Sequence, residues 1–124
     1  MDNNVIERTG WIGVDLDGTL AEYTDWTGPY SIGKPIKPMV RRIQKWVEAG
    51  WEVRIFTARV AIGQYGKEIR NEIRSTIGRW CKQHIGFFLP VTCVKDYECV
   101  AIYDDRAVAV ELNTGKILGG KEIG

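Results

Sequence analysis

The chain has 124 residues and a formal net charge of +1; 44% of its residues are apolar and 27% are charged. This length fits a single domain, 1–124, and the near-zero charge gives no general attraction to nucleic acid or membrane. No apolar run is long enough to span a bilayer, and the polar start of the chain does not read as a secretory signal. The odd set of three cysteines, without CxxC spacing, predicts reduced thiols in a cytoplasmic protein and no zinc site.

The first half of the chain predicts two strands and one helix. Residues 11–14 form an apolar run typical of a buried strand. Residues 20–35, which we call the flap, are rich in glycine, proline and aromatic side chains, as in a loop or hairpin. Residues 38–49 repeat apolar side chains at helical spacing, and Gly50 stands where a helix-ending glycine belongs. Residues 51–56 then predict the second strand.

The second half repeats this order of elements. Residues 64–84 predict another amphipathic helix, and residues 90–94 and 100–103 predict two more strands. Residues 107–118 are expected to add one more short strand or helix. Strands that alternate with helices predict an α/β fold with a parallel sheet covered on both faces.

Polar side chains follow each predicted strand. Ligands of parallel α/β sheets bind at the carboxyl ends of the strands, so these side chains are the candidate site. They are, in chain order, Asp15, Asp17, Thr57, Arg59, Lys95, Asp104 and Asp105. Carboxylates packed together repel one another unless a cation neutralises them, and an all-oxygen ligand set suits Mg²⁺. Lysine and hydroxyl groups are donors for phosphoryl oxygens.

The same residues resemble the motifs of a known family. The run Asp15-Leu16-Asp17-Gly18-Thr19, followed by Thr57, Lys95 and Asp104-Asp105 in that order, resembles the four motifs of the haloacid dehalogenase superfamily. The resemblance extends from Asp15 to Asp105. It implies a three-layer Rossmannoid parallel sheet and Mg²⁺-dependent hydrolysis of phosphomonoesters through an aspartyl-phosphate.

The resemblance also implies roles for the acidic residues. Asp15 is expected to be the nucleophile that attacks phosphorus. Asp17 is expected to act as general acid and then as general base, with its backbone carbonyl also on the metal. Asp104 and Asp105 are expected to complete the Mg²⁺ site with Asp15 and Asp17, and Asp105 is the favoured direct ligand.

The remaining roles concern the phosphate. Thr57 is expected to hydrogen-bond the transferring phosphoryl group, and Gly18 and Arg59 are expected to bind substrate. Lys95 is expected to hold nucleophile and phosphate, with Lys34 as its rival. Plainer roles stay open: Thr57 as a helix cap, Arg59 as a surface charge and Lys95 as a solvated loop lysine.

The short flap leaves room only for a minimal cap, so the site is expected to be open. An open site suits a large substrate such as a nucleic-acid end, and Asp104-Asp105-Arg106 resembles the polynucleotide 3′-phosphatases. A small phosphorylated molecule fits if a neighbouring subunit of a homo-oligomer closes the site. The flap aromatics Tyr23, Trp26 and Tyr30 either pack onto the core or stack on a base or sugar. The competing class is a non-enzymatic binding module on the same fold.

Overall fold

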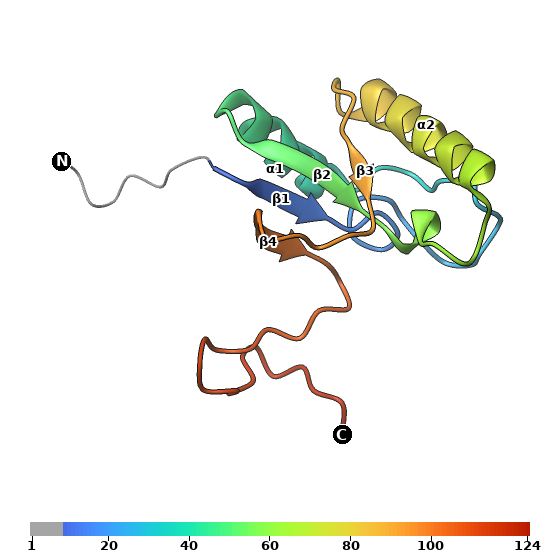
Figure 1. Cartoon of the computed structure of the whole chain (residues 1–124). Coiled ribbons are helices and arrows are strands. Elements are labelled where there is room, and N and C mark those ends of the chain that lie inside the picture. Colours follow the sequence, from blue (N-terminus) through green and yellow to red (C-terminus); the bar gives the residue numbers. More distant parts are fainter. Residues whose placement is uncertain (1–8) are drawn as a thin grey trace.

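The protein contains a four-stranded parallel sheet with two helices (Figure 1). The computed structural model describes residues 9–124, so the polar start of the chain lies outside the described residues. The strands are β1 (Trp11–Val14), β2 (Glu52–Phe56), β3 (Val91–Thr92) and β4 (Cys99–Tyr103), in the order β3-β2-β1-β4. Helix α1 (Lys37–Glu48) joins β1 to β2, and α2 (Lys67–His84) joins β2 to β3. The predicted α/β fold with a parallel sheet is confirmed.

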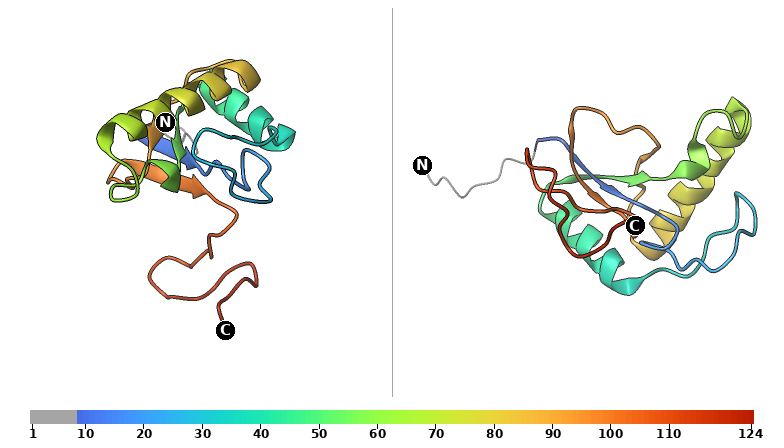
Figure 2. Two further views of the ribbon diagram at one scale, coloured as in Figure 1. Left: turned by 90° about the vertical axis from the view of Figure 1, so that its right-hand side faces the viewer. Right: turned by 90° about the horizontal axis from the view of Figure 1, so that it is seen from below.

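Both helices pack on the same face of the sheet. One buried cluster contains Val14 and Ile55 from the strands, Ile43 from α1 and Ile77 from α2. Figure 2 shows the two helices together on one side of the strands. The chain steps from β1 to β2 to β3 in one direction, and right-handed crossovers then place both helices on one face. The expected three layers are therefore wrong: residues 9–124 form two layers, a sheet and one layer of helices.

The opposite face of the sheet is covered at one end by a single indole. Trp11 is fully buried and donates from its ring Nε1 to the Asp96 carboxylate at 2.8 Å. The guanidinium of Arg54 lies over the same ring, 4.7 Å from its centroid. Asp96 belongs to the loop of residues 93–98 that returns the chain from β3 to β4, so a loop and not a helix contacts that face.

Glycines explain where the helices begin and end. Gly50, at φ +94°, follows α1, and the bonds from Gly50 N to Val47 O and from Trp51 N to Trp46 O form a Schellman ending, as predicted. Helix α2 begins at Lys67 and not at residue 64, because Gly63 at φ +102° and the extended Gly66 hold the preceding residues in a turn. The expected element at 107–118 is reduced to one isolated bridge, between Val110 and Ile117.

Candidate functional site

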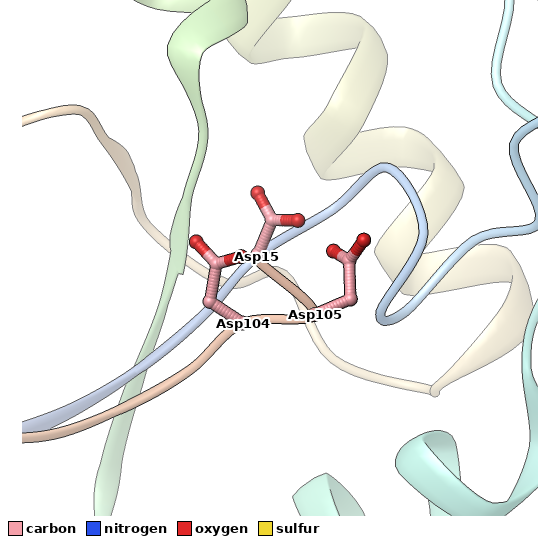
Figure 3. A group of neighbouring side chains, drawn as sticks. All are labelled: Asp15, Asp104 and Asp105. Atoms are coloured by element: carbon pink, nitrogen blue, oxygen red, sulfur yellow. The ribbon is translucent and has the colours of Figure 1, made fainter. Parts of the chain in front are cut away.

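Three carboxylates meet at the carboxyl ends of β1 and β4. Asp15 directly follows β1, and its backbone N–H donates to the carbonyl of Tyr103 at 2.9 Å, which extends the pairing of the two strands. Asp104 and Asp105 directly follow β4. One oxygen from each of the three side chains lies within 4.8 Å of the others, and Figure 3 shows all three carboxyl groups projecting to the same side. The sheet thus brings together acids from the two ends of the sequence, as predicted.

Burial and the neighbouring carboxylates raise the pKa of Asp15. Burial is the largest cause that raises the pKa of Asp15 from 3.8 to about 7, followed by the negative charge of Asp104. A hydrogen bond and the charge of Asp105, and then the charge of Asp17, act in the same direction. The atoms that could bind a metal in this cluster are all carboxylate oxygens. This ligand set fits a hard divalent cation, whose charge would offset their repulsion.

Two residues of the first motif, the run from Asp15 to Thr19, lie against Asp105 and position it. The Thr19 hydroxyl accepts from the backbone N–H of Asp105 at 2.9 Å and lies 3.0 Å from Asp105 Oδ1 and 3.5 Å from Asp15 Oδ2. Gly18, at φ +92°, passes so close that an added Cβ would lie 2.8 Å from Asp105 Oδ2. Gly18, expected to bind substrate, therefore lies against a carboxylate. Thr19 received no role from the sequence, although its place in the motif was the available signal.

Asp17 lies apart from the three clustered carboxylates because Arg59 binds it. Arg59 donates from Nε to Asp17 Oδ2 at 2.8 Å and from its terminal nitrogen to Asp17 Oδ1 at 2.7 Å. A third donor of the same guanidinium reaches the carbonyl of Pro29 at 3.0 Å, and the Trp26 ring lies 5.0 Å away. Arg59 is only 6% exposed, so it is not a surface charge. It links the first motif to the flap.

Thr57 is placed at the site by the end of β2. Its backbone N–H donates to the carbonyl of Thr92 at 2.9 Å, and its hydroxyl accepts from the backbone N–H of Arg59 at 3.1 Å. This second bond caps the short 3₁₀ helix η1 (Ala58–Val60). Thr57 therefore has the role of a helix cap. Its side chain is buried, with 2% exposure, and it also lines the cleft into which the carboxylates open.

Neither of the two candidate lysines, Lys95 and Lys34, lines the cleft into which the three carboxylates open. Strand β3 ends at Thr92, and Lys95 is an exposed residue of the loop that leaves the strand ends toward Trp11. Lys34 is exposed as well and contributes its carbonyl to the base of the flap, where it accepts from Glu22 N at 2.8 Å. The cations that line the cleft are Arg59 and Arg106. Outside it, Lys121 donates to the backbone oxygen of Asp105.

The acids open into a cleft of about 480 Å³ between the strand ends and the flap. Its lining includes Asp15, Asp17 and the paired Asp104 and Asp105 on one side. Tyr23 and Trp26 of the flap line it as well, and so does Phe56, whose ring lies 6.3 Å from that of Trp11. The site is therefore open, with a small flap where a cap would stand.

Among the described residues, three hydrogen bonds that involve side chains join the flap to the body of the protein. The first is the bond from Arg59 to Pro29. Tyr30 donates from its hydroxyl to Glu72 of α2 at 2.7 Å, and the Trp80 indole donates to the carbonyl of Gly33 at 3.2 Å. Of the flap aromatics, Tyr30 thus packs outward on α2, while Tyr23 and Trp26 face the cleft.

Known proteins supply no identification. No protein-family model, curated protein or solved structure matches this chain. None of the helices within residues 9–124 has the length and apolar character needed to cross a membrane.

Proposed function

We propose that the protein is a Mg²⁺-dependent phosphomonoester hydrolase that acts through an aspartyl-phosphate on Asp15, as the resemblance to the haloacid dehalogenase superfamily implies. The observation that best supports this proposal is the meeting of Asp15, Asp104 and Asp105 at adjacent strand ends, on the floor of an open cleft. Phosphoryl transfer needs mainly alignment and charge neutralisation, and both are within reach of residues placed in this way.

The chemistry divides between two carboxylates. A carboxylate oxygen of Asp15 attacks phosphorus, so that a new phosphorus–oxygen bond forms while the bond to the ester oxygen breaks. Asp17 gives a proton to the departing ester oxygen and then takes one from the water that releases phosphate from Asp15. Mg²⁺, held by Asp15, Asp105 and Asp104 with the backbone carbonyl of Asp17, would let the anionic carboxylate approach the anionic phosphate.

Three further cleft residues are expected to bind the phosphate. Arg59 and Arg106 are the available cations for phosphoryl oxygens, in the place where a lysine was expected. Thr57 lies beside them on the cleft wall and is held by its cap bond to Arg59 N. An arginine pair presents planar donors that suit the paired oxygens of a phosphate.

The test is hydrolysis of an aryl phosphate in the presence of Mg²⁺. We expect turnover by the wild-type chain, its loss in Asp15→Asn, and its loss on addition of EDTA with recovery when Mg²⁺ is restored. Glu48→Gln is the matched control, because Glu48 is an exposed carboxylate at the far end of α1. Full activity in Asp15→Asn would refute the nucleophile, and activity in EDTA would refute the metal. A wild-type chain that binds phosphate esters without hydrolysing them would indicate a binding module.

A further inference from the structure

The cleft is far larger than a phosphoryl group needs. Its volume of about 480 Å³ falls in the range of pockets that enclose a whole small molecule. The acids and arginines occupy one part of the lining, where the phosphate is proposed to bind. The rest of the lining therefore belongs to the group esterified to the phosphate, and its chemistry defines that group.

That part of the lining is aromatic. Tyr23 is 44% exposed and Trp26 is 46% exposed, so both rings keep free surface although they line the cleft. Rings of this kind bind flat π-systems by stacking, with an energy that depends little on the identity of the base.

Polar groups are scarce on the same walls. Outside the acids and arginines, the polar side chains that line the cleft are Thr57, Gln64 and the hydroxyl of Tyr23. The Thr57 hydroxyl accepts from the backbone N–H of Arg59 and keeps its own proton to donate. A sugar phosphate without a base has no flat ring, so it would leave the exposed faces of Tyr23 and Trp26 without a stacking partner. A flat base needs few partners, and the Gln64 amide offers both a donor and an acceptor for its edge.

Trp26 is joined to the acidic end of the cleft through Arg59. The Arg59 guanidinium binds Asp17 and the carbonyl of Pro29 while it lies against the Trp26 ring. One buried side chain therefore contacts both the phosphate end of the cleft and the ring. A contact of this kind reduces the ordering that substrate binding requires.

We propose that the substrate is the phosphomonoester of a nucleoside, with its base against Trp26 and Tyr23; this inference rests on the proposed phosphatase function. A free mononucleotide and the phosphorylated end of a strand present the same chemistry. We expect kcat/KM for thymidine 3′- or 5′-monophosphate, or for a short oligonucleotide with a terminal phosphate, to exceed that for glycerol 2-phosphate at least tenfold. A preference for the oligonucleotide would assign the site to strand ends, and a preference for the mononucleotide would assign it to free nucleotides.

Variants of the wall test the inference directly. Trp26→Ala should lower the nucleotide-to-glycerol-phosphate ratio about five- to a hundredfold, the range expected for loss of one stacking partner. Trp26→Phe should retain most of the ratio, and Tyr23→Ala should lower it independently. Tyr97→Ala, a change at a fully exposed tyrosine outside the cleft, is the control. Calorimetric binding of thymidine monophosphate and glycerol 2-phosphate to Asp15→Asn with Mg²⁺ gives the same comparison without turnover.

The outcomes separate the inference from the function on which it rests. Equal kcat/KM for nucleotide and glycerol phosphate, or an unchanged ratio in both Trp26→Ala and Tyr23→Ala, would overturn the inference and leave the phosphatase intact. Failure to hydrolyse any phosphate ester would overturn the proposed function. In that case, preferential calorimetric binding of thymidine monophosphate would still support the aromatic base site.

Discussion

Arg59 donates to both carboxylate oxygens of Asp17, at 2.8 and 2.7 Å, so a buried guanidinium holds the expected acid of the reaction in place. Each carboxylate oxygen has two lone pairs and Arg59 uses one of each, so Asp17 keeps acceptor capacity for a proton. A bound phosphate is a competing partner for the same guanidinium.

Arg59→Ala should both destabilise the protein and reduce turnover. It leaves the Asp17 carboxylate and the Pro29 carbonyl without their donor, and we expect a loss of about 2 kcal/mol in the free energy of unfolding. Arg59→Lys restores the charge without the two-point geometry and should recover stability better than turnover. Urea unfolding and aryl phosphate hydrolysis measure the two effects. Equal stability of Arg59→Ala and the surface control Arg79→Ala would contradict the role.

Gly18→Ala should displace Asp105. The new methyl group would lie 2.8 Å from Asp105 Oδ2, and the positive φ adds backbone strain. Gly63→Ala is a matched control, because Gly63 has φ +102° and nothing within 4 Å of its added Cβ. Both variants should lose about 1 kcal/mol of stability from strain. Only Gly18→Ala should also weaken the rise in melting temperature that we expect from the proposed Mg²⁺ site, and an identical Mg²⁺ response in both variants would exclude the collision.

Thr19→Val should loosen the acidic cluster while preserving side-chain shape. The change removes the acceptor of the Asp105 backbone N–H and the hydroxyl near Asp105 Oδ1. We expect a loss of about 1 kcal/mol in stability and a lower Mg²⁺ affinity. Thr24→Val, at an exposed flap position, is the control. Magnesium titration followed by thermal unfolding compares the two, and an unaltered Mg²⁺ affinity in Thr19→Val would count against a positioning role.

Asp96 should make stability depend on acid pH. The hydrogen bond from the Trp11 indole is the main cause that lowers the pKa of Asp96; the backbone N–H of Glu98 and the charge of Arg54 act in the same direction. A lowered pKa in the folded state stabilises the fold above the unfolded pKa of about 3.9, and this contribution is lost as pH falls through the folded value. Asp96→Asn should therefore lose less stability than wild type between pH 5 and pH 3, values that bracket this range.

Urea midpoints at the two pH values measure the difference. Asp25→Asn, at an exposed flap position, serves as the control and should follow the wild-type dependence. The same fall of the midpoint in Asp96→Asn as in wild type would show that the Trp11 contact does not perturb Asp96.

The helices and strands were predictable because their residues repeat at helical or strand spacing. The face on which each helix packs was not, since β1 is buried along its whole length and Trp11 reads as core in either arrangement. The placement depends on strand order, which a local pattern does not contain. The late start of α2 followed from the positive φ of Gly63 and the extended backbone of Gly66, and helical periodicity does not reveal either of them.

The acidic site was predictable for a related reason. Parallel strands end at one edge, so Asp15 and Asp105 had to come close once both were assigned to strand ends. The same reasoning does not place Lys95 at the site, because β3 ends three residues before it and the chain then turns back toward Trp11. The pairing of Arg59 with Asp17 depends on the folded flap, whose position no spacing in the sequence specifies.

The pairing of β1 with β4 also has a consequence for the order in which the protein is made. Of the strands within residues 9–124, β1 leaves the ribosome first and β4 leaves it last, and the three carboxylates follow the ends of these two strands. Contacts between distant parts of a chain form late, because the intervening chain must first be ordered. A nascent chain that ends before Cys99 has only Asp15 of the three clustered acids. The proposed activity therefore appears only when synthesis has passed the final strand.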